Sequence, residues 1–149
     1  MTRCLCFFLI TLLIGFCLPT KIFSQKTTSS FIKGIWMTHN EKAQIKIFRK
    51  KNRYYGKIVW LKNPKDSLGQ KITDRNNPKE NLRNQPLIGL QILNAITFEN
   101  ESWKNGTIYD PENGKSYSLS IRRKGRDIEL RGYSGGSNIG RIQIWTRFR

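Results

Sequence analysis

Hydrophobic and polar residues alternate with a period of two along most of the chain after residue 30. The alternation is clearest over residues 116–123, where Tyr117, Leu119 and Ile121 share one face and serines occupy the other. Successive side chains of a β-strand point to opposite faces, so this pattern predicts strands with one buried face. Eight strands are predicted, at residues 31–38, 43–50, 53–61, 87–98, 103–110, 115–123, 126–133 and 139–148.

Short polar connections between these strands predict an antiparallel meander. Residues 50–52 (KKN) and 124–125 (KG) tolerate the positive φ of tight hairpins. An eight-stranded meander leaves unpaired edges unless it closes on itself. We therefore predict an all-β fold, a single antiparallel eight-stranded barrel, whose interior is either filled by side chains or holds one small ligand.

Residues 62–86 interrupt the alternating strand pattern and form a long polar segment rich in Asn and Pro. Within it, Asn77 is suited to cap a helix and Pro78 to occupy the first helical position. The side chain of Glu80 could reach back to the backbone of the cap residue. We expect one long loop with a short helix. Such a loop serves either as a lid over a binding site or as a structural arm across one end of the barrel.

The first 24 residues differ from the rest of the chain. Arg3 supplies a positive start, residues 5–18 form an almost unbroken apolar run, and Ser24 is a small residue before Gln25. This is the pattern of a secretory signal peptide, and the run is short for a membrane span, which needs about 20 residues. We expect a signal peptide at 1–24 cleaved near Ser24-Gln25, a flexible tether at 25–30, a barrel domain at 31–149 without a transmembrane span, and a periplasmic or secreted location.

The predicted cleavage changes both the cysteine content and the charge. Cys4, Cys6 and Cys17 all lie in the leader, so the remaining domain has no disulfide. Cleavage also removes Arg3 and Lys21 from 27 Lys+Arg, which leaves 25 against 10 Asp+Glu and a net charge of +15. This excess either favours anionic partners or only keeps the surface solvated.

Two motifs resemble ligand-binding loops but are better explained as turns. Residues 110–114 (DPENG) have the oxygen-rich character of a calcium loop, yet Lys115 takes the sixth position, where such a loop needs glycine. Their Pro, Asn and Gly fit a hairpin turn instead. Residues 135–141 (GGSNIGR) approach a P-loop, but an alternating strand pattern follows them in place of a helix. We predict no metal site and no cofactor.

Candidates for catalysis are few. His39 is the sole histidine and lies at a predicted turn, so it cannot form a multi-histidine metal site. Asp74, in the long loop, and Asp110, at a strand end, are the carboxylates considered for acid–base work in a small hydrolase. Arg75 and Arg83 predict a structural ion pair for Asp74 instead. The sequence thus favours a non-enzymatic protein.

Two clusters of basic residues lie at predicted hairpin tips. If the tips share one rim of the barrel, they form a positive collar that suits an anionic surface. Aromatic residues interleave with them, a combination that also binds single-stranded nucleic acid, but an exported protein seldom meets nucleic acid, so this partner is not expected. The clusters consist of Arg49, Lys50, Lys51, Arg53, Arg122, Arg123, Lys124 and Arg126.

Two family resemblances follow from particular residues. Gly34-Ile35-Trp36 on the first strand and Arg147 on the last resemble the lipocalin and calycin barrels, in which a Trp and an Arg pack across the closed end. This implies that Gly34, Trp36 and Arg147 close the barrel. A longer set of blocks resembles the domain-of-unknown-function 2147 family of exported bacterial proteins: YGKIVWLKNP, TDRNNP, LRNQPLIGLQIL, WKNGTIYDPENGKSYS, LRGY and GRIQIWTR. That resemblance implies a leader and one lipocalin-like barrel, without an activity.

The leading hypothesis is a binding module of the cell envelope that holds a small amphipathic or apolar ligand in the barrel. Trp60, Tyr109 and Tyr117 are expected to line the site, and Arg83 to anchor an anionic head group, although core packing also accounts for the aromatic residues. The alternative is an envelope adaptor that binds anionic lipids, glycans or a protein through its basic tips. A hydrolase using Asp74 or Asp110 is the third hypothesis.

Overall fold

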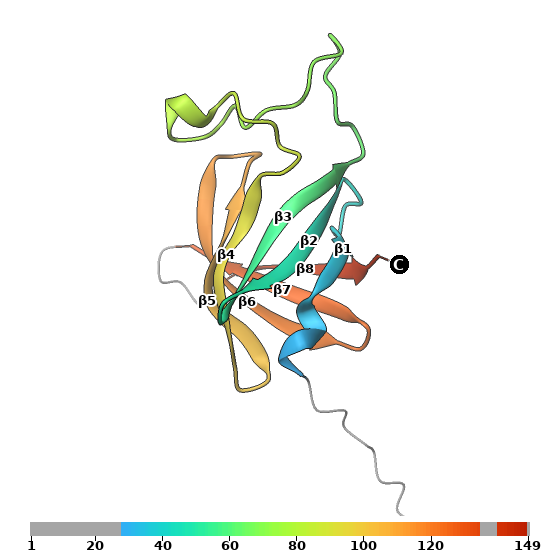
Figure 1. Ribbon diagram of the computed structural model, residues 1–149, viewed down its shortest axis with the longest axis vertical. Helices are drawn as coiled ribbons and strands as arrows, with labels where there is room; N and C mark the ends of the chain where they lie inside the picture. The colour runs from blue at the N-terminus through green and yellow to red at the C-terminus, as the bar shows by residue number, and fades with distance from the viewer. Residues whose placement is uncertain (1–27, 135–139, 149) are drawn as a thin grey trace, which may run out of the picture.

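Eight antiparallel strands follow one another in sequence order and close into a barrel (Figure 1). The computed structural model describes residues 28–134 and 140–148. The strands are β1 (Gly34–Met37), β2 (Ala43–Lys50), β3 (Arg53–Leu61), β4 (Gln91–Glu99), β5 (Ser102–Asp110), β6 (Lys115–Lys124), β7 (Asp127–Tyr133) and β8 (Gly140–Arg147). The predicted all-β barrel of eight strands is confirmed.

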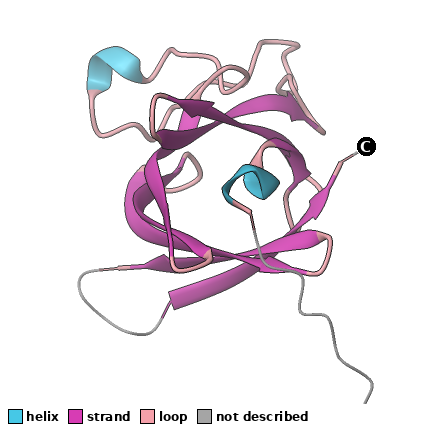
Figure 2. Cartoon of the chain, turned by 60° about the horizontal axis from the view of Figure 1, so that its bottom comes forward, coloured by secondary structure: helices cyan, strands magenta, loops and turns pink. Residues whose placement is uncertain are grey.

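The first strand begins later than predicted because a short helix precedes it. Residues Ser29–Ile32 form the 3-10 helix η1, which sits in the middle of the lower end of the barrel (Figure 2). Ile32 is fully buried there, and its burial draws the polypeptide into the barrel end. The tether predicted at 25–30 is therefore too long, since Ser29 and Ser30 belong to η1. Residues 1–27, including the predicted signal peptide, lie outside the described residues.

Large side chains fill the lower half of the barrel. Trp36, Trp103 and Trp145 are each at most 2% exposed, and the indole N–H groups of Trp36 and Trp103 donate to the carbonyls of Ile32 (2.8 Å) and Ser29 (3.2 Å) in η1. Helix η1, which plugs the lower end, is thus joined to the strands by side-chain hydrogen bonds as well as by packing. The other fully buried aliphatic residues of the barrel strands are Ile45, Ile47, Leu93, Ile96, Ile121 and Ile128.

A β-bulge near the upper end of β3 changes which side chains face inward. Ile45 of β2 pairs with Ile58, but the next residue, Gln44, pairs with Trp60, so one residue of β3 is left over. The extra residue reverses the alternation. Trp60 therefore shares the outer face with Gln44 and is 39% exposed.

The connection between β3 and β4 lies over the upper end of the barrel and carries the second 3-10 helix, η2 (Glu80–Leu82) (Figure 1). The predicted loop with a short helix is present, but the helix starts at Glu80, two residues after the predicted first position, Pro78. Asn77 Oδ1 accepts the N–H of Lys79 (2.9 Å), while Lys79 is extended and Asn77 is buried. Asn77 therefore organises the loop interior and does not cap η2. Among the described residues, no helix is long and apolar enough to cross a membrane.

Candidate functional site

The upper half of the barrel encloses a cavity of about 830 Å³. Its volume lies within the range of pockets that hold small organic ligands. The strands supply apolar side chains to its wall because the inward face of each strand is the hydrophobic one. The apolar wall consists of Ile45, Ile58, Ile92, Ile108, Leu119 and Leu130.

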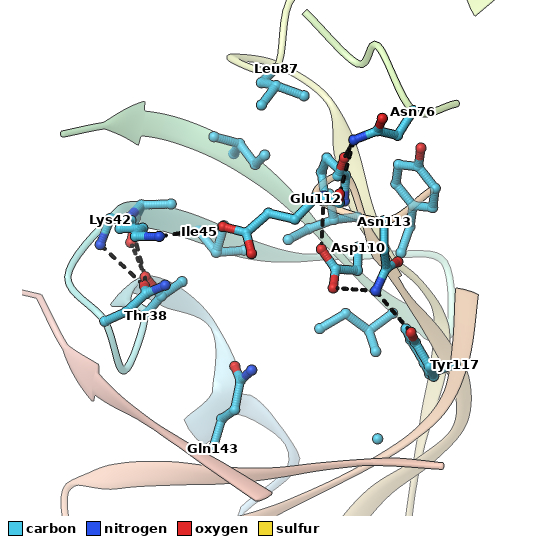
Figure 3. A pocket seen from close by; sticks show the side chains of 18 of the residues that line it. Thr38, Lys42, Ile45, Asn76, Leu87, Asp110, Glu112, Asn113, Tyr117 and Gln143 are labelled. Atoms are coloured by element: carbon cyan, nitrogen blue, oxygen red, sulfur yellow. Dashed lines mark hydrogen bonds and ion pairs between the residues drawn. The ribbon is translucent and has the colours of Figure 1, made fainter. Parts of the chain in front are cut away.

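Polar side chains surround the mouth of the cavity (Figure 3). They come from the β1–β2 turn, the β3–β4 loop, the β5–β6 turn and the start of β8. Three are cations, Lys42, Arg75 and Arg141, and three are carboxylates, Asp66, Asp110 and Glu112. The pocket thus combines an apolar depth with a polar rim, the distribution that suits an amphipathic molecule.

The β3–β4 loop is attached to the β5–β6 turn, so it forms a lid beside the mouth. Asn76 Nδ2 donates to the carbonyls of Pro111 (3.1 Å) and Glu112 (2.9 Å) (Figure 3). Gly114 has φ +70°, and a Cβ at this position would collide with the carbonyl of Asn76. The lid therefore approaches the turn closely at the one residue that has no side chain.

Asp74 fixes the interior of the lid to the barrel. Its carboxylate is fully buried, and it accepts hydrogen bonds from the Tyr109 hydroxyl (2.7 Å) and from Asn77 Nδ2 (2.6 Å). Burial, followed by the nearby Asp74 carboxylate, raises the pKa of Tyr109 to about 12. The tyrosine consequently remains a proton donor to Asp74 throughout the neutral range.

The ion pair predicted for Asp74 is not formed, because its carboxylate points into the protein while both arginines stay exposed. Arg75 pairs with Asp66 (3.0 Å), and Arg83 Nε donates to the Asn77 carbonyl (2.9 Å). The backbone N–H groups of Gln70 and Leu68 also contact Asp66, and with Arg75 they lower its pKa. Asp66 thereby organises the outer turn of the lid.

The predicted ligand-binding residues divide into two groups. Tyr109 and Tyr117 line the cavity, although their hydroxyl groups bond to Asp74 (2.7 Å) and Asn113 (2.9 Å). Trp60 and Arg83 do not line it, which corrects the prediction: the bulge turns Trp60 outward, and Arg83 is bound to the backbone of the lid. The cations at the mouth are instead Lys42, Arg75 and Arg141.

The β5–β6 turn that resembled a calcium loop is a hairpin. Gly114 N–H donates to the Asp110 carbonyl (2.8 Å), and the Asp110 carboxylate accepts the Glu112 N–H (2.9 Å) and Asn113 Nδ2 (3.0 Å). Within the described part of the chain, no three His, Cys, Asp or Glu side chains gather as metal ligands would. The carboxylate of Asp110 therefore bonds within the turn, and that of Asp74 is buried and bonded to Tyr109 and Asn77.

Two further motifs have simple positions in the structure. His39 is exposed in the β1–β2 turn at the rim of the cavity. Of the segment that resembled a P-loop, residues 135–139 lie outside the described residues, and Gly140 and Arg141 begin a strand. A P-loop requires a helix at this point.

The residues that sequence similarity assigned to barrel closure meet at the lower end. The Arg147 guanidinium lies 4.3 Å from the centre of the Trp36 ring and donates to the carbonyls of Phe31 (2.5 Å) and Lys33 (3.3 Å). Burial lowers the pKa of Arg147, and these contacts compensate for its lost hydration. A Cβ on Gly34 would lie 2.9 Å from the same guanidinium, so glycine leaves the space that Arg147 occupies.

Sequence reasoning did not identify the residues that attach the lid. Asn76, Asn77 and Tyr109 act through single side-chain hydrogen bonds between distant segments, and such bonds leave no periodic pattern in the sequence. The recurrence of TDRNNP, residues 73–78, among the family blocks was the available indication. It contains Asp74, Asn76 and Asn77.

Comparison with known proteins agrees with the architecture. A family model described as "Uncharacterized protein conserved in bacteria (DUF2147)" matches residues 34–147. A solved structure from the human pathogen Helicobacter pylori, described as belonging to the lipocalin family, superposes with a TM-score of 0.66 and 24% sequence identity, over 78% of this chain and 82% of that one. This likeness shows the lipocalin-like fold. No curated protein matches the chain.

Proposed function

The chain belongs to the DUF2147 family, and on that premise we propose that it is a non-enzymatic module that binds a small amphipathic ligand in its barrel. The observation that supports this most directly is the cavity of about 830 Å³ with an apolar wall and a polar rim. The lipocalin-like fold is consistent with a ligand held inside the barrel.

The division of the cavity specifies the orientation of the ligand. Its apolar part lies against Ile58, Ile92 and Leu119, where burial contributes about 25 cal/mol per Å² of apolar surface. Its polar group remains at the rim, near Arg75 and Arg141. Because Asp66 already neutralises Arg75 (3.0 Å), Arg141 is the better anchor for an anionic head group.

The proposal places this module in the cell envelope. The support is the sequence of residues 1–24, which has the pattern of a signal peptide, and the absence of cysteine from residues 25–149. An amphipathic ligand is abundant in that compartment. The compartment is tested by fractionating cells that express the full chain and determining the N-terminal residue of the product.

The first experiment is native mass spectrometry of the protein isolated gently from its own cells, beside a denatured sample. A reproducible additional mass that disappears on denaturation supports the proposal and identifies the ligand. A bare mass that persists after incubation with envelope lipid extract contradicts it. Anilinonaphthalene sulfonate, which is apolar and anionic, provides a fluorescent probe of the same cavity.

A matched pair of variants locates the bound molecule. Ile108 lines the cavity and its neighbour Thr107 is exposed on the outer face of β5. Ile108→Trp fills the cavity and should reduce probe binding at least about tenfold, whereas Thr107→Trp should leave it unchanged. Equal loss in both variants, or none in either, would place the probe outside the barrel. Binding should also persist at about 1 M salt, because apolar burial is not screened.

A further inference from the structure

The closed end of the barrel carries an unusual concentration of exposed cations. In an antiparallel meander alternate hairpins lie at the same end, so the β2–β3 and β6–β7 tips both lie opposite the lid (Figure 1). We propose that this end docks on an anionic lipid bilayer, with contacts from Lys50, Lys51, Arg53, Arg122, Lys124 and Arg126.

The two ends of the molecule differ in how their charges are compensated. The ion pairs of the described residues, Lys42–Glu112 (3.6 Å) and Arg75–Asp66 (3.0 Å), both lie at the mouth. The six cations named above are exposed and form no ion pair within the described ranges. Their charge is therefore available to an external anion.

Both basic tips are held in shape by an arginine of their own strand. Arg49 Nε donates to the Lys51 carbonyl (3.0 Å), and Arg123 Nε donates to the Gly125 carbonyl (2.8 Å). Lys51 and Gly125 occupy equivalent positions with φ of 54° and 62°. The two turns thus share one geometry, and their lysines and remaining arginines project from preorganised loops.

Aromatic side chains accompany the cations, which favours a lipid interface. Phe148 follows Arg147 at this end and is 45% exposed. Phe48 and Tyr55 stack with ring centres 6.1 Å apart on the outer face of β2 and β3, close to the first tip. Basic residues beside partly exposed rings are typical of proteins that settle at the boundary between head groups and acyl chains.

The third hairpin at this end bears on whether the surface suits a lipid bilayer or a linear polyanion such as a nucleic acid. The β4–β5 tip lies between the basic tips in strand order and carries Glu99 and Glu101. Anionic lipids diffuse, so they can collect beneath the basic tips and leave the acidic one. The phosphates of a nucleic acid are fixed along one chain, which would have to pass the carboxylates. The observations therefore favour a lipid surface.

Co-sedimentation with vesicles tests this surface in the full exported protein. Binding is expected to vesicles of phosphatidylcholine with phosphatidylglycerol, to be absent with phosphatidylcholine alone, and to fall steeply between about 0.05 and 0.2 M salt. Neutralising one tip, as Lys50→Gln/Lys51→Gln/Arg53→Gln or as Arg122→Gln/Lys124→Gln/Arg126→Gln, should lower the partition coefficient by roughly 100-fold, since each cation near an anionic surface contributes about 1 kcal/mol.

The lid supplies a control of equal charge at the opposite end. Lys62→Gln/Lys65→Gln/Lys71→Gln removes three exposed cations and should change vesicle binding by less than about threefold, because these residues lie beyond the Debye length of about 10 Å from the docked surface. If this variant lost as much vesicle binding as the tip variants, binding would depend on net charge alone, and the proposal would be overturned. So would binding to single-stranded DNA without binding to anionic vesicles. Unchanged probe fluorescence in the tip variants verifies folding and an intact cavity.

Discussion

Arg147 joins several parts of the closed end of the barrel. Its guanidinium lies against the rings of Trp36 (4.3 Å) and Phe31 (4.9 Å) and donates to two carbonyls around η1. A planar fork is needed to stack on rings and to donate in two directions, and an ammonium group cannot reproduce it. The contribution of this residue is therefore geometric as well as electrostatic.

We predict that Arg147→Lys lowers the free energy of unfolding by about 2 kcal/mol, the scale of a lost charged hydrogen bond with its stacking. Urea unfolding followed by tryptophan fluorescence measures the change. Arg122→Lys, on the exposed outer face of β6, is the control and should shift stability by less than about 0.5 kcal/mol. Similar losses in both variants would contradict the role assigned to Arg147.

Tyr109 gives the lid a dependence on alkaline pH. Its pKa is raised to about 12 in the folded protein from an unfolded value near 10, so the folded state resists its ionisation. The corresponding stability is fully present below about pH 10 and is lost as the pH rises toward 12.

Tyr109→Phe should cost about 2 kcal/mol near pH 7, because it leaves one oxygen of buried Asp74 without its donor. The difference in stability between the two proteins should then shrink between about pH 10 and 12. Tyr117→Phe, whose hydroxyl only accepts from exposed Asn113 (2.9 Å), serves as the comparison. A pH-independent difference would show that the Tyr109 hydroxyl does not titrate with the folded state.

The lid approaches the backbone of the β5–β6 turn most closely at Gly114. Gly114 and Gly125 both have positive φ, +70° and +62°, but a Cβ at Gly125 would meet open space, while one at Gly114 would strike the Asn76 carbonyl. Substitution by alanine has a similar backbone cost at the two sites, about 1 kcal/mol. Only the first substitution also displaces the lid.

Gly114→Ala is therefore predicted to accelerate hydrogen exchange of residues 62–90 on the order of tenfold, corresponding to about 1.4 kcal/mol of lost docking. Gly125→Ala should leave exchange in the lid unaltered although its overall stability falls. Mass spectrometry of the exchanged peptides resolves the two segments. A lid that exchanges equally in both variants would mean that the contact between Gly114 and Asn76 does not hold it.

The seam between β1 and β8 is short. It consists of the pairs Trp36↔Arg147 and Met37↔Thr146, whereas β7 and β8 are joined by six pairs, from Ile128↔Trp145 to Tyr133↔Gly140. Among the described residues, Gly140 to Trp145 have no strand on their second side, and Ile142 in their middle is 49% exposed. Edge strands of this kind carry unpaired backbone groups.

This edge predicts an alternating pattern of amide protection over residues 140–145. Amides that point to β7 should exchange slowly, and those that point away should exchange at least about 100-fold faster, since they lack a partner within the described chain. Amide-resolved exchange by NMR distinguishes them, with β5, which is paired on both sides, as the reference. Uniform protection would instead mean that another strand occupies the edge.

At the scale of the whole molecule, periodicity and turn chemistry were sufficient for the strand number and the closure. Each inward face is hydrophobic, so eight alternating segments specify eight walls of one core. The features that were not predicted from the sequence depend on contacts between distant segments. The bulge that exposes Trp60, the plug formed by Ser29–Ile32 and the burial of Asp74 against Tyr109 each require knowledge of a partner far along the chain.

The cavity was predictable only as an alternative to a filled core. Both outcomes need the same alternation, and the sequence does not indicate how far a side chain reaches across the barrel. Here the three buried indoles all lie in the lower half, while isoleucines and leucines line the upper half. The difference in side-chain volume along the barrel axis leaves one half empty.

The pairing of β1 with β8 also sets the order of assembly in time. These strands lie at 34–37 and 140–147, and Arg147, which contacts η1, is made more than one hundred residues after it. Until β8 has been synthesised, neighbouring strands can form hairpins, but the barrel cannot close and Arg147 cannot contact η1. Barrel closure thus brings together residues more than one hundred positions apart, and slow folding is expected from such distant contacts.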